Sequence, residues 1–371
     1  MSELFIGLMS GTSLDGVDAV LARFPEAGAM QVLGHAHQPF AKALREELLS
    51  LNQSGPDELH RAALAANGLA RSYADLVAQL LEQCGLCASD IQAIGAHGQT
   101  VRHRPGEFDG IGYTSQLLNG ALLAEQSGIA VVCDLRSRDV AAGGQGAPLV
   151  PAFHRAVFGR AGESLGVLNV GGFSNISLLL ADEQTLGFDC GPGNCLMDAW
   201  ISEQRGMDYD ANGAWAAEGQ VLPELLQALL AEPFFAKPPP RSTGRDLFHR
   251  AWLQHHLARL VTTPRAEDVQ ATLLELSARA VADSLRGQKQ VLSRLLVCGG
   301  GALNSELMRR LQALLPESEV ASSDAAGLPV MQVEAAAFAW LAMRFVRGLP
   351  GNLPAVTGAA GPRILGALHP A

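Results

Sequence analysis

The chain has 371 residues, 48% of them hydrophobic and 17% charged, so it can bury a large core and is long enough for two domains or a duplicated pair. Its formal net charge of −10 argues against nucleic acid as a partner, because binding to a phosphate backbone depends on clustered Lys and Arg. No stretch reaches the ~20 apolar residues of a membrane span and no basic, apolar leader opens the chain, so we expect a cytoplasmic protein with no membrane partner.

The first predicted element is a hairpin whose turn is rich in Gly, Ser and Thr. Apolar strands at 5–9 and 17–22 flank this turn at 10–16. Free backbone N–H groups and hydroxyls in such a turn suit a polyanion such as a triphosphate. The same device recurs where strands at 165–170 and 176–180 flank a Gly-rich turn at 171–175. We therefore expect an internally duplicated chain that holds ATP from two sides.

Between the two hairpins, the pattern alternates strands and helices. We predict strands at 32–37, 91–96 and 130–133, and helices at 61–81 and 121–126. The strand at 91–96 ends in a polar segment that contains His97, Gln99 and Thr100. Ligands bind at the carboxyl ends of strands in open α/β sheets, so we interpret these side chains as ligand contacts. A loop histidine with internal partners is the alternative for His97.

The run at 141–148 is too rich in Gly for regular structure and indicates a crossover between the two halves. We accordingly predict an N-terminal domain of residues 1–135 plus 346–371 and a C-terminal domain of residues 136–345. The second half adds a polar turn, a proline-rich loop, further helices and one more strand. We expect the polar turn at 189–194 and the proline-rich loop at 238–245. Helices are expected from Leu196, at 269–285 and at 333–345, and the strand at 295–298.

A third Gly-rich turn, Gly299, Gly300 and Gly301, lies between the strand at 295–298 and a helix start. Backbone without side chains lets a base and ribose approach closely, so this turn suits adenosine. The chain has neither a GxxxxGK[ST] string nor a strand-borne GxGxxG, which leaves the three turns together as the indication of nucleotide binding.

This order of two phosphate turns and an adenosine turn resembles the superfamily of sugar kinases, heat-shock ATPases and actin. Within it, the chain resembles the anhydro-N-acetylmuramic acid kinase family over essentially its whole length. The strings that carry the resemblance are GLMSGTSLDGVD at 7–18, HGQT at 97–100, DVAAGGQGAPLVP at 139–151, GFDCGPGN at 187–194 and CGGG at 298–301. One loop differs, because Leu118 and Gly120 stand where the family usually has Gly and Pro in TxQIGNP.

The resemblance implies an α/β fold with two related domains of mixed sheet flanked by helices around a deep cleft, as in actin and hexokinase. It also implies that ATP and water act together on 1,6-anhydro-N-acetylmuramic acid in peptidoglycan recycling. The anhydro bond opens at C1 while O6 takes the γ-phosphoryl group, which gives N-acetylmuramic acid 6-phosphate and ADP. Asp189 is the candidate base for the water, with a turn aspartate as the alternative.

The ATP site is assigned to the three turns, with Mg²⁺ as cofactor. Asp15 is the candidate metal ligand, with an Asx turn as the alternative reading. The residues expected to bind ATP are Gly11, Thr12, Ser13, Leu14, Asp15, Gly16, Val17 and Asp18 in the first turn, Gly171, Gly172 and Asn175 in the second, and Gly299, Gly300 and Gly301 in the third.

The substrate of the family carries a carboxylate, which a planar guanidinium recognises through two hydrogen bonds. Arg138 is the first candidate for this contact and Arg136 the second, although either can be a surface charge or an internal ion-pair partner. The residues expected to bind the sugar are His97, Gln99, Thr100, Arg138, Asp139 and Glu334.

Two other functions remain open at this point. One is a different sugar or carboxylate kinase of the same fold, which transfers phosphate without hydrolysis. The other is an actin-like ATPase whose output is assembly. We also expect a homodimer, although an apolar helix such as 269–285 fits a core as well as an interface.

Overall fold

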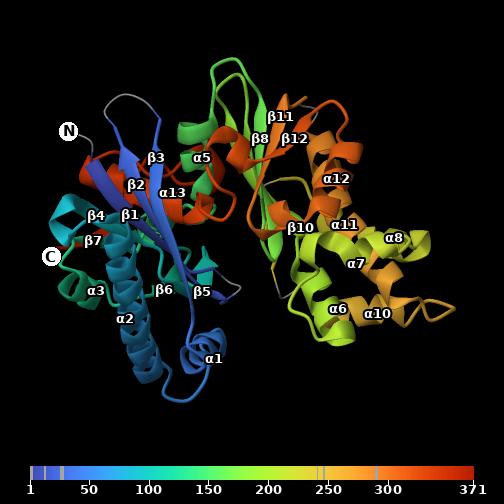
Figure 1. The fold of residues 1–371 in the computed structure, drawn as a ribbon, viewed down its shortest axis with the longest axis horizontal. Coiled ribbons are helices and arrows are strands. Elements are labelled where there is room, and N and C mark those ends of the chain that lie inside the picture. The colour runs from blue at the N-terminus through green and yellow to red at the C-terminus, as the bar shows by residue number, and fades with distance from the viewer. Residues whose placement is uncertain (1–2, 12–13, 26–28, 240, 245–246, 289–290) are drawn as a thin grey trace. The chain divides into compact units, whose positions relative to one another are not determined.

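The computed structural model describes residues 3–11, 14–25, 29–239, 241–244, 247–288 and 291–371. The chain divides into two compact units, Met1–Val157 with Gln332–Ala371 (unit 1) and Phe158–Met331 (unit 2). Each unit contains a mixed β-sheet with helices packed against it (Figure 1). The expected α/β class with two units of mixed sheet is therefore confirmed.

Unit 1 combines a six-stranded sheet, a separate two-stranded hairpin and several helices. Its strands are β1 (Glu3–Met9), β2 (Gly16–Phe24), β3 (Gln31–Pro39), β4 (Ile91–Ala96), β5 (Gln99–Pro105), β6 (Gly112–Leu117), β7 (Val131–Cys133) and β13 (Ala367–His369). Its helices are α1 (Lys42–Ser50), α2 (Glu58–Cys84), α3 (Gly120–Ser127), α4 (Ser137–Ala141), α13 (Val333–Val346) and α14 (Pro354–Thr357), and α5 (Val150–Phe158) lies at its end.

Unit 2 contains a five-stranded sheet and most of the remaining helices. Its strands are β8 (Leu165–Val170), β9 (Phe173–Leu179), β10 (Thr185–Pro192), β11 (Arg294–Cys298) and β12 (Glu319–Ser322). Its helices are α6 (Cys195–Arg205), α7 (Ala214–Glu218), α8 (Pro223–Leu230), α9 (Pro233–Ala236), α10 (Arg250–Leu257), α11 (Ala266–Gly287) and α12 (Ser305–Leu314).

The two sheets share one topology, which confirms the duplication expected from the paired hairpins. The strand order is β13-β7-β4-β1-β2-β3 in unit 1 and β10-β9-β8-β11-β12 in unit 2. In each unit the first three strands form an antiparallel meander, and the next strand of the sheet pairs in parallel with the first. Both Gly-rich hairpin turns thus join the first and second strands of their sheets.

Helix α13 belongs to unit 1, because it packs closely on β1 and β4. Gly7 and Gly95 are neighbours in the register of these strands. A Cβ at either position would overlap the backbone of α13, at Ala335 and Phe338 respectively. Two adjacent glycines therefore form the groove in which the helix lies.

The unit boundaries fall at 157/158 and 331/332, which differs from the expected 135/136 and 345/346. The Gly-rich crossover lies inside unit 1 because it is tied to the C-terminal segment. Gln145 N–H donates to the Thr357 carbonyl at 2.7 Å. The Asp139 carboxylate accepts from Gly146 N–H at 2.8 Å and from Asn352 at 2.7 Å. Glycine content marked an irregular segment but gave no information about these partners.

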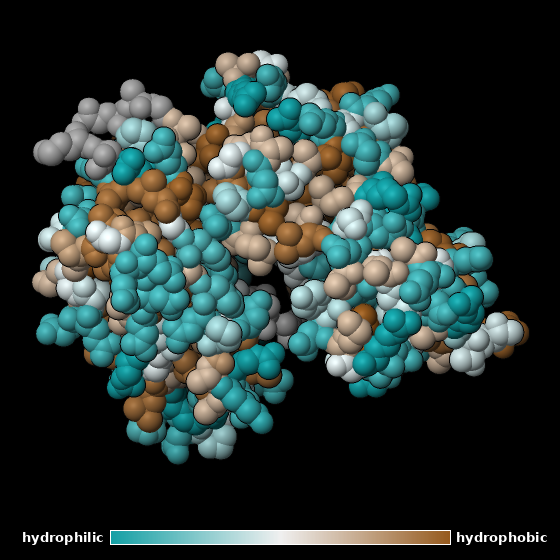
Figure 2. Space-filling view, viewed as in Figure 1, coloured by the Kyte–Doolittle hydropathy of each residue, from teal (hydrophilic) through white to brown (hydrophobic). Residues whose placement is uncertain are grey.

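Each unit has its own hydrophobic core. Helix α2 covers unit 1 with a buried stripe that includes Leu69, Tyr73 and Leu76, and it ends at Gly85 in the left-handed conformation typical of helix C-termini. Hydrophilic residues predominate on the outward surface around α2 (Figure 2). In unit 2, α11 is buried along most of its length, which favours the core reading of 269–285. Among the described residues, no helix combines the length and apolar character needed to cross a bilayer.

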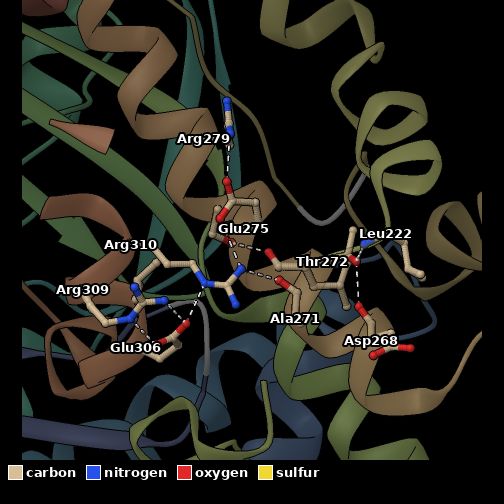
Figure 3. Close-up of polar contacts among 12 residues, drawn as sticks. Leu222, Asp268, Ala271, Thr272, Glu275, Arg279, Glu306, Arg309 and Arg310 are labelled. Atoms are coloured by element: carbon tan, nitrogen blue, oxygen red, sulfur yellow. Dashed lines mark hydrogen bonds and ion pairs between the residues drawn. The ribbon is translucent and has the colours of Figure 1, made fainter. Parts of the chain in front are cut away.

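An ion-pair network joins α11 to α12. Arg310 lies between two carboxylates, Glu306 at 2.8 Å and Glu275 at 3.2 Å (Figure 3). Arg310 also donates to the Ala271 carbonyl at 2.9 Å, and Arg309 pairs with Glu306 from the outer side. The network fixes the first turns of α12, which follows directly after residues 299–304.

Candidate active site

The first Gly-rich turn joins β1 to β2 in unit 1 and has an uncommon backbone. Leu14 is buried, adopts a left-handed conformation with φ of 57°, and donates its N–H to the Gly11 carbonyl at 3.3 Å. Few residues other than glycine adopt this left-handed conformation, and those that do are often found at functional turns. Asp15 is exposed, whereas Gly16 and Val17 are buried in β2. Thr12 and Ser13, both expected to bind ATP, lie outside the described residues.

Side chains from other elements fix this turn through its carbonyl groups. Arg45 Nε donates to the Leu14 carbonyl at 2.9 Å, and Gln99 Nε2 donates to the Gly11 carbonyl at 3.2 Å. The Ser10 hydroxyl donates to the Gly98 carbonyl at 3.1 Å and lies 2.9 Å from the Tyr73 hydroxyl. These contacts anchor the described turn residues Ser10, Gly11 and Leu14 to α1, α2 and the segment 98–99.

Asp18, expected among the ATP contacts, is engaged elsewhere. One carboxylate oxygen lies 3.0 Å from His35 Nε2 and 3.1 Å from His37 Nδ1. Both histidines belong to β3, and Asp18 is directly opposite His37 in the β2–β3 register. This arrangement favours a structural role for Asp18 in joining the two strands. A sequence motif alone could not distinguish Asp18 from Asp15.

In the polar segment after β4, His97 and Gln99 hydrogen-bond to the first turn, whereas Thr100 bonds within the β5–β6 hairpin. Both ring nitrogens of His97 have internal partners, and Gln99 is 1% exposed with its amide on the turn. Thr100 lies on β5 and accepts a hydrogen bond from Gln116 at 3.1 Å. The alternative reading of His97 as a histidine with internal partners therefore fits the geometry better than direct sugar contact.

The two arginines after β7 differ sharply in environment. Arg136 donates from Nη1 to the Gly146 carbonyl at 2.7 Å and from Nε and Nη2 to His97 Nε2 at 3.1 and 3.0 Å. Burial lowers the pKa of Arg136 to about 10, while the charges of Glu334 and Asp139 raise it, so the guanidinium stays charged at neutral pH. Arg138 is exposed. Arg136 is thus held by protein partners, whereas Arg138, the first candidate from the sequence, is a surface residue.

Asp139 is fully buried, which differs from its expected role as a sugar contact. Its carboxylate accepts from Gly146 N–H, from Asn352 and, at 2.8 Å, from the Thr357 hydroxyl. These partners satisfy the carboxylate internally, so Asp139 organises the crossover segment. Glu334 is partly buried in the first turn of α13 and acts electrostatically on Arg136.

In unit 2, the second Gly-rich turn is bonded to the start of α6. Gly193 N–H donates to the Gly172 carbonyl and Asn194 N–H to the Gly171 carbonyl, both at 2.9 Å. A Cβ at Gly193 would overlap the Gly171 carbonyl, so only glycine allows this approach. Asn175 lies on β9 and pairs with Asp189 on β10.

The third Gly-rich turn packs against the end of β8, the strand that directly precedes the second Gly-rich turn in the sequence. A Cβ at Gly299 would overlap the Asn169 side chain, and a Cβ at Gly301 would overlap Val170. Gly299 also has a left-handed φ of 77°. The second and third turns, predicted from distant parts of the chain, are therefore neighbours in one unit.

Asp189 is held by a loop that the sequence indicated only as irregular. Its N–H donates to the Arg241 carbonyl at 3.0 Å, and its carboxylate accepts from Thr243 N–H at 2.9 Å. Arg241 Nε in turn donates to the Asp189 carbonyl at 3.0 Å. Burial raises the pKa of the Asp189 carboxyl to about 6, against the lowering effects of the Thr243 N–H and the Arg241 charge. In the sequence, the arginine inside this Pro- and Gly-rich loop was the feature that could have indicated a contact with Asp189.

No group of three or more His, Cys, Asp or Glu side chains within the described ranges could hold a metal ion on its own. A magnesium ion bound with a nucleotide needs fewer, since phosphates and waters supply most of its ligands. The exposed Asp15 in the first turn is compatible with that arrangement.

Comparison with known proteins gives full-length matches. The family model for anhydro-N-acetylmuramic acid kinase matches residues 3–371. A relative from Variovorax paradoxus (strain S110) with that name is 60% identical over 374 residues and covers 100% of this chain and 99% of its own length. Another from Cupriavidus pinatubonensis (strain JMP 134 / LMG 1197) is 58% identical and covers 99% of this chain and 98% of its own length.

Among solved structures, the chain is similar to the activator of the 2-hydroxyisocaproyl-CoA dehydratase from Clostridium difficile with bound ADPNP. The TM-score is 0.49 at 13% sequence identity, with 94% of this chain and 96% of that chain covered. The assignment rests instead on the sequence relatives, which match along the whole length. The chain therefore belongs to the anhydro-N-acetylmuramic acid kinase family and is a kinase that uses ATP to phosphorylate a sugar hydroxyl.

Proposed function

We propose that this kinase opens the 1,6-anhydro ring of anhydro-N-acetylmuramic acid with water while it phosphorylates O6. The products are N-acetylmuramic acid 6-phosphate and ADP. The observation that carries the proposal is Asp189, a largely buried carboxylate with a pKa raised to about 6, at the β10 edge beside a Gly-rich turn. Ring opening needs such a base to activate water at the acetal carbon. Transfer to a free hydroxyl would use the same carboxylate to accept the hydroxyl proton, so the experiment below separates the two reactions.

The steps balance as follows. Asp189 takes a proton from water, and the hydroxyl forms a bond to C1 of the sugar. The C1–O6 bond breaks, O6 forms a bond to the γ-phosphorus, and the bond between that phosphorus and the β-phosphate oxygen breaks to release ADP. With a pKa of about 6, Asp189 is mostly ionised at neutral pH and still basic enough to accept the proton.

The three Gly-rich turns are proposed to hold ATP. Backbone N–H groups around Gly11 and Gly16 in unit 1 and Gly171 and Gly172 in unit 2 suit the phosphates. The turn at 299–301 is proposed to contact adenosine at Gly300, where a Cβ would meet no atom closer than 3.8 Å, while Gly299 and Gly301 pack against β8. Thr12 and Ser13 remain predictions from the sequence.

Mg²⁺ is proposed as the cofactor, with Asp15 as the protein group that would hold it, through water. When bound, the ion supplies positive charge that neutralises the β- and γ-phosphates. Asp15 is exposed and follows Leu14, whose carbonyl accepts a hydrogen bond from Arg45.

For the substrate carboxylate, we propose Arg136 in place of Arg138. Within the described residues, the contacts of Arg136 use three of the five guanidinium N–H groups, which leaves two for a bidentate interaction. Thr100 and Glu334 remain candidates for contacts to sugar hydroxyls. The reaction is placed in the cytoplasm, where ATP is available, and the protein is proposed to act as a homodimer.

Isotope-labelled water tests the ring-opening step. With anhydro-N-acetylmuramic acid, ATP and H₂¹⁸O, one labelled oxygen is expected at C1 of the phosphorylated product and none in ADP. Ring-opened N-acetylmuramic acid serves as the comparison substrate. Phosphorylation without label at C1, or faster turnover of the ring-opened sugar, would contradict the proposal and favour an ordinary sugar kinase.

A further inference from the structure

His97 connects the proposed anion receptor to the first Gly-rich turn. On one side, Nδ1 lies 3.3 Å from the Ser10 carbonyl. On the other side, Nε2 lies 3.1 Å from Nε and 3.0 Å from Nη2 of Arg136. All three residues belong to unit 1. One imidazole ring therefore contacts both the residue proposed to bind sugar and the turn proposed to bind phosphate.

The partners of His97 define its protonation. A carbonyl oxygen only accepts hydrogen bonds, so the hydrogen is on Nδ1 and is donated to Ser10. A guanidinium only donates, so Nε2 carries a lone pair and accepts from Arg136. Burial lowers the pKa of His97 to about 3, and the charge of Arg136 lowers it further, so the ring stays neutral. Both ring nitrogens are thereby committed to protein partners.

Packing fixes the ring in this position. His97 is 6% exposed, and its ring lies 4.8 Å from that of Phe338 between centroids. The next residue, Gly98, has a left-handed φ of 74°, and a Cβ there would lie 2.7 Å from the Leu117 carbonyl. Gln99 then donates to the Gly11 carbonyl at 3.2 Å. The segment 97–99 thus reaches two successive carbonyls of the turn.

We propose that His97 is a positioning residue that couples Arg136 to the first Gly-rich turn, so that sugar binding and ATP binding depend on one shared framework. The sugar side of this proposal rests on the function proposed above for Arg136. The ATP side rests on the hydrogen bond to Ser10 and on the phosphate-binding role proposed above for the first Gly-rich turn. Each side is broken by a different substitution, which allows them to be tested separately.

The test uses three variants of the full-length protein. In His97→Asn the shorter amide can replace Nδ1 and keep the bond to Ser10, but it cannot reach Arg136. In His97→Gln the longer amide can replace Nε2 and keep the bond to Arg136, but it loses the bond to Ser10. His97→Phe keeps the ring packing and loses both bonds. His60→Asn, at an exposed position on α2, is the matched control.

Steady-state kinetics should separate the two sides. His97→Asn is expected to raise the KM for the sugar about three- to tenfold, which is the range for the loss of one hydrogen bond. The KM for ATP should stay near its original value. His97→Gln is expected to show the reverse pattern. His97→Phe should raise both, and His60→Asn neither. A rise in the sugar KM alone in all three variants would mean direct sugar contact and would overturn the proposal.

Two further measurements keep the outcome decisive. Arg136→Met should raise the KM for the sugar; if it does not, the function proposed for Arg136 is wrong, while the ATP side of the His97 proposal still stands on His97→Gln. If the His97 variants fail to fold, the tautomer is read in the unaltered protein by ¹⁵N-histidine NMR. A neutral ring protonated at Nδ1 between pH 5 and 9 is expected, and protonation at Nε2 would overturn the proposal.

Discussion

At the scale of single residues, the environment of Asp189 decides what its carboxyl group can do. The loop at 241–244 holds its backbone and one carboxylate oxygen, and burial makes the carboxyl more basic than an exposed aspartate. We predict that Asp189→Asn lowers kcat by ~10² to 10⁴ with little change in ATP affinity, because shape is kept and basicity is lost. Asp182→Asn, at an exposed position in the same unit, is the control.

The measurement is kcat for phosphorylation together with nucleotide affinity from calorimetry. A variant that turns over at close to the original rate would eliminate Asp189 as the base. A variant that loses nucleotide affinity in parallel with kcat would instead indicate a structural role for the carboxylate.

The pKa of Asp189 also predicts how activity depends on pH. A base acts in its ionised form, so with a pKa of about 6 the ionised fraction, and with it kcat/KM, should fall as pH drops through 6. The fall should approach tenfold per pH unit below that value. A profile of kcat/KM between pH 5 and 8 measures it, and the residual activity of Asp189→Asn should lack the acid limb. An unchanged rate down to pH 5 would rule out a base with this pKa.

The sequence pattern pointed to Asp189 through a strand end expected before a Gly-Pro-Gly turn. In the structure β10 continues to Pro192, and the role of Asp189 as the base stays a prediction. The sequence pattern did not identify how His97, Asp18 and Asp139 are used. Each of these has partners on elements distant in the chain, such as Arg136, β3 and Thr357. A polar residue at a strand end can contact a ligand or support a neighbouring turn, and only the tertiary contacts distinguish the two.

At the scale of elements, apolar strands were predicted well and polar ones were not. The strands at 91–96 and 165–170 match β4 and β8 because nearly all of their residues are buried and most are apolar, with Gln92 the exposed exception. The hairpin of β5 and β6 was missed because its strands carry Gln, Thr, Arg and His. Helix α13 was predicted but assigned to the other half, since its packing on Gly7 and Gly95 is a tertiary feature.

The ion pairs between α11 and α12 allow a matched comparison. The Arg310 side chain is 10% exposed and pairs with two carboxylates that are each 12% exposed, whereas Arg309 is 66% exposed. We predict that Arg310→Met lowers the free energy of unfolding of unit 2 by about 2 kcal/mol, because two largely buried carboxylates lose their buried partner and keep only Arg309 and Arg279, which are more exposed. Arg309→Met should cost less than about 1 kcal/mol.

Urea denaturation of the two variants measures the difference. Because α12 follows the third Gly-rich turn, Arg310→Met should also raise the KM for ATP more than Arg309→Met does. Equal destabilisation by both substitutions would show that the buried position of Arg310 adds nothing to the strength of the network.

At the scale of the whole molecule, one topology is used twice with different additions. Unit 1 adds β13 and the hairpin of β5 and β6, and unit 2 adds the helices between β10 and β11. The duplicated part supplies a Gly-rich turn in each unit. Arg136 follows β7 in unit 1, and the segment between β10 and β11 contains the loop that holds Asp189 in unit 2. The paired hairpins made the duplication visible in the sequence, while the expected cleft between the halves stays a prediction.

Because each unit has its own core, damage to one core should remain in that unit. Leu69 on α2 and Leu276 on α11 are both fully buried, each within the core of its own unit. We predict that Leu69→Ala and Leu276→Ala each cost about 2 to 5 kcal/mol through lost burial and a residual cavity. Hydrogen exchange followed by mass spectrometry should show faster exchange for β1 and β4 in Leu69→Ala, with β8 and β11 unchanged, and the reverse in Leu276→Ala. Equal acceleration in all four strands would mean that the two cores unfold as one cooperative body.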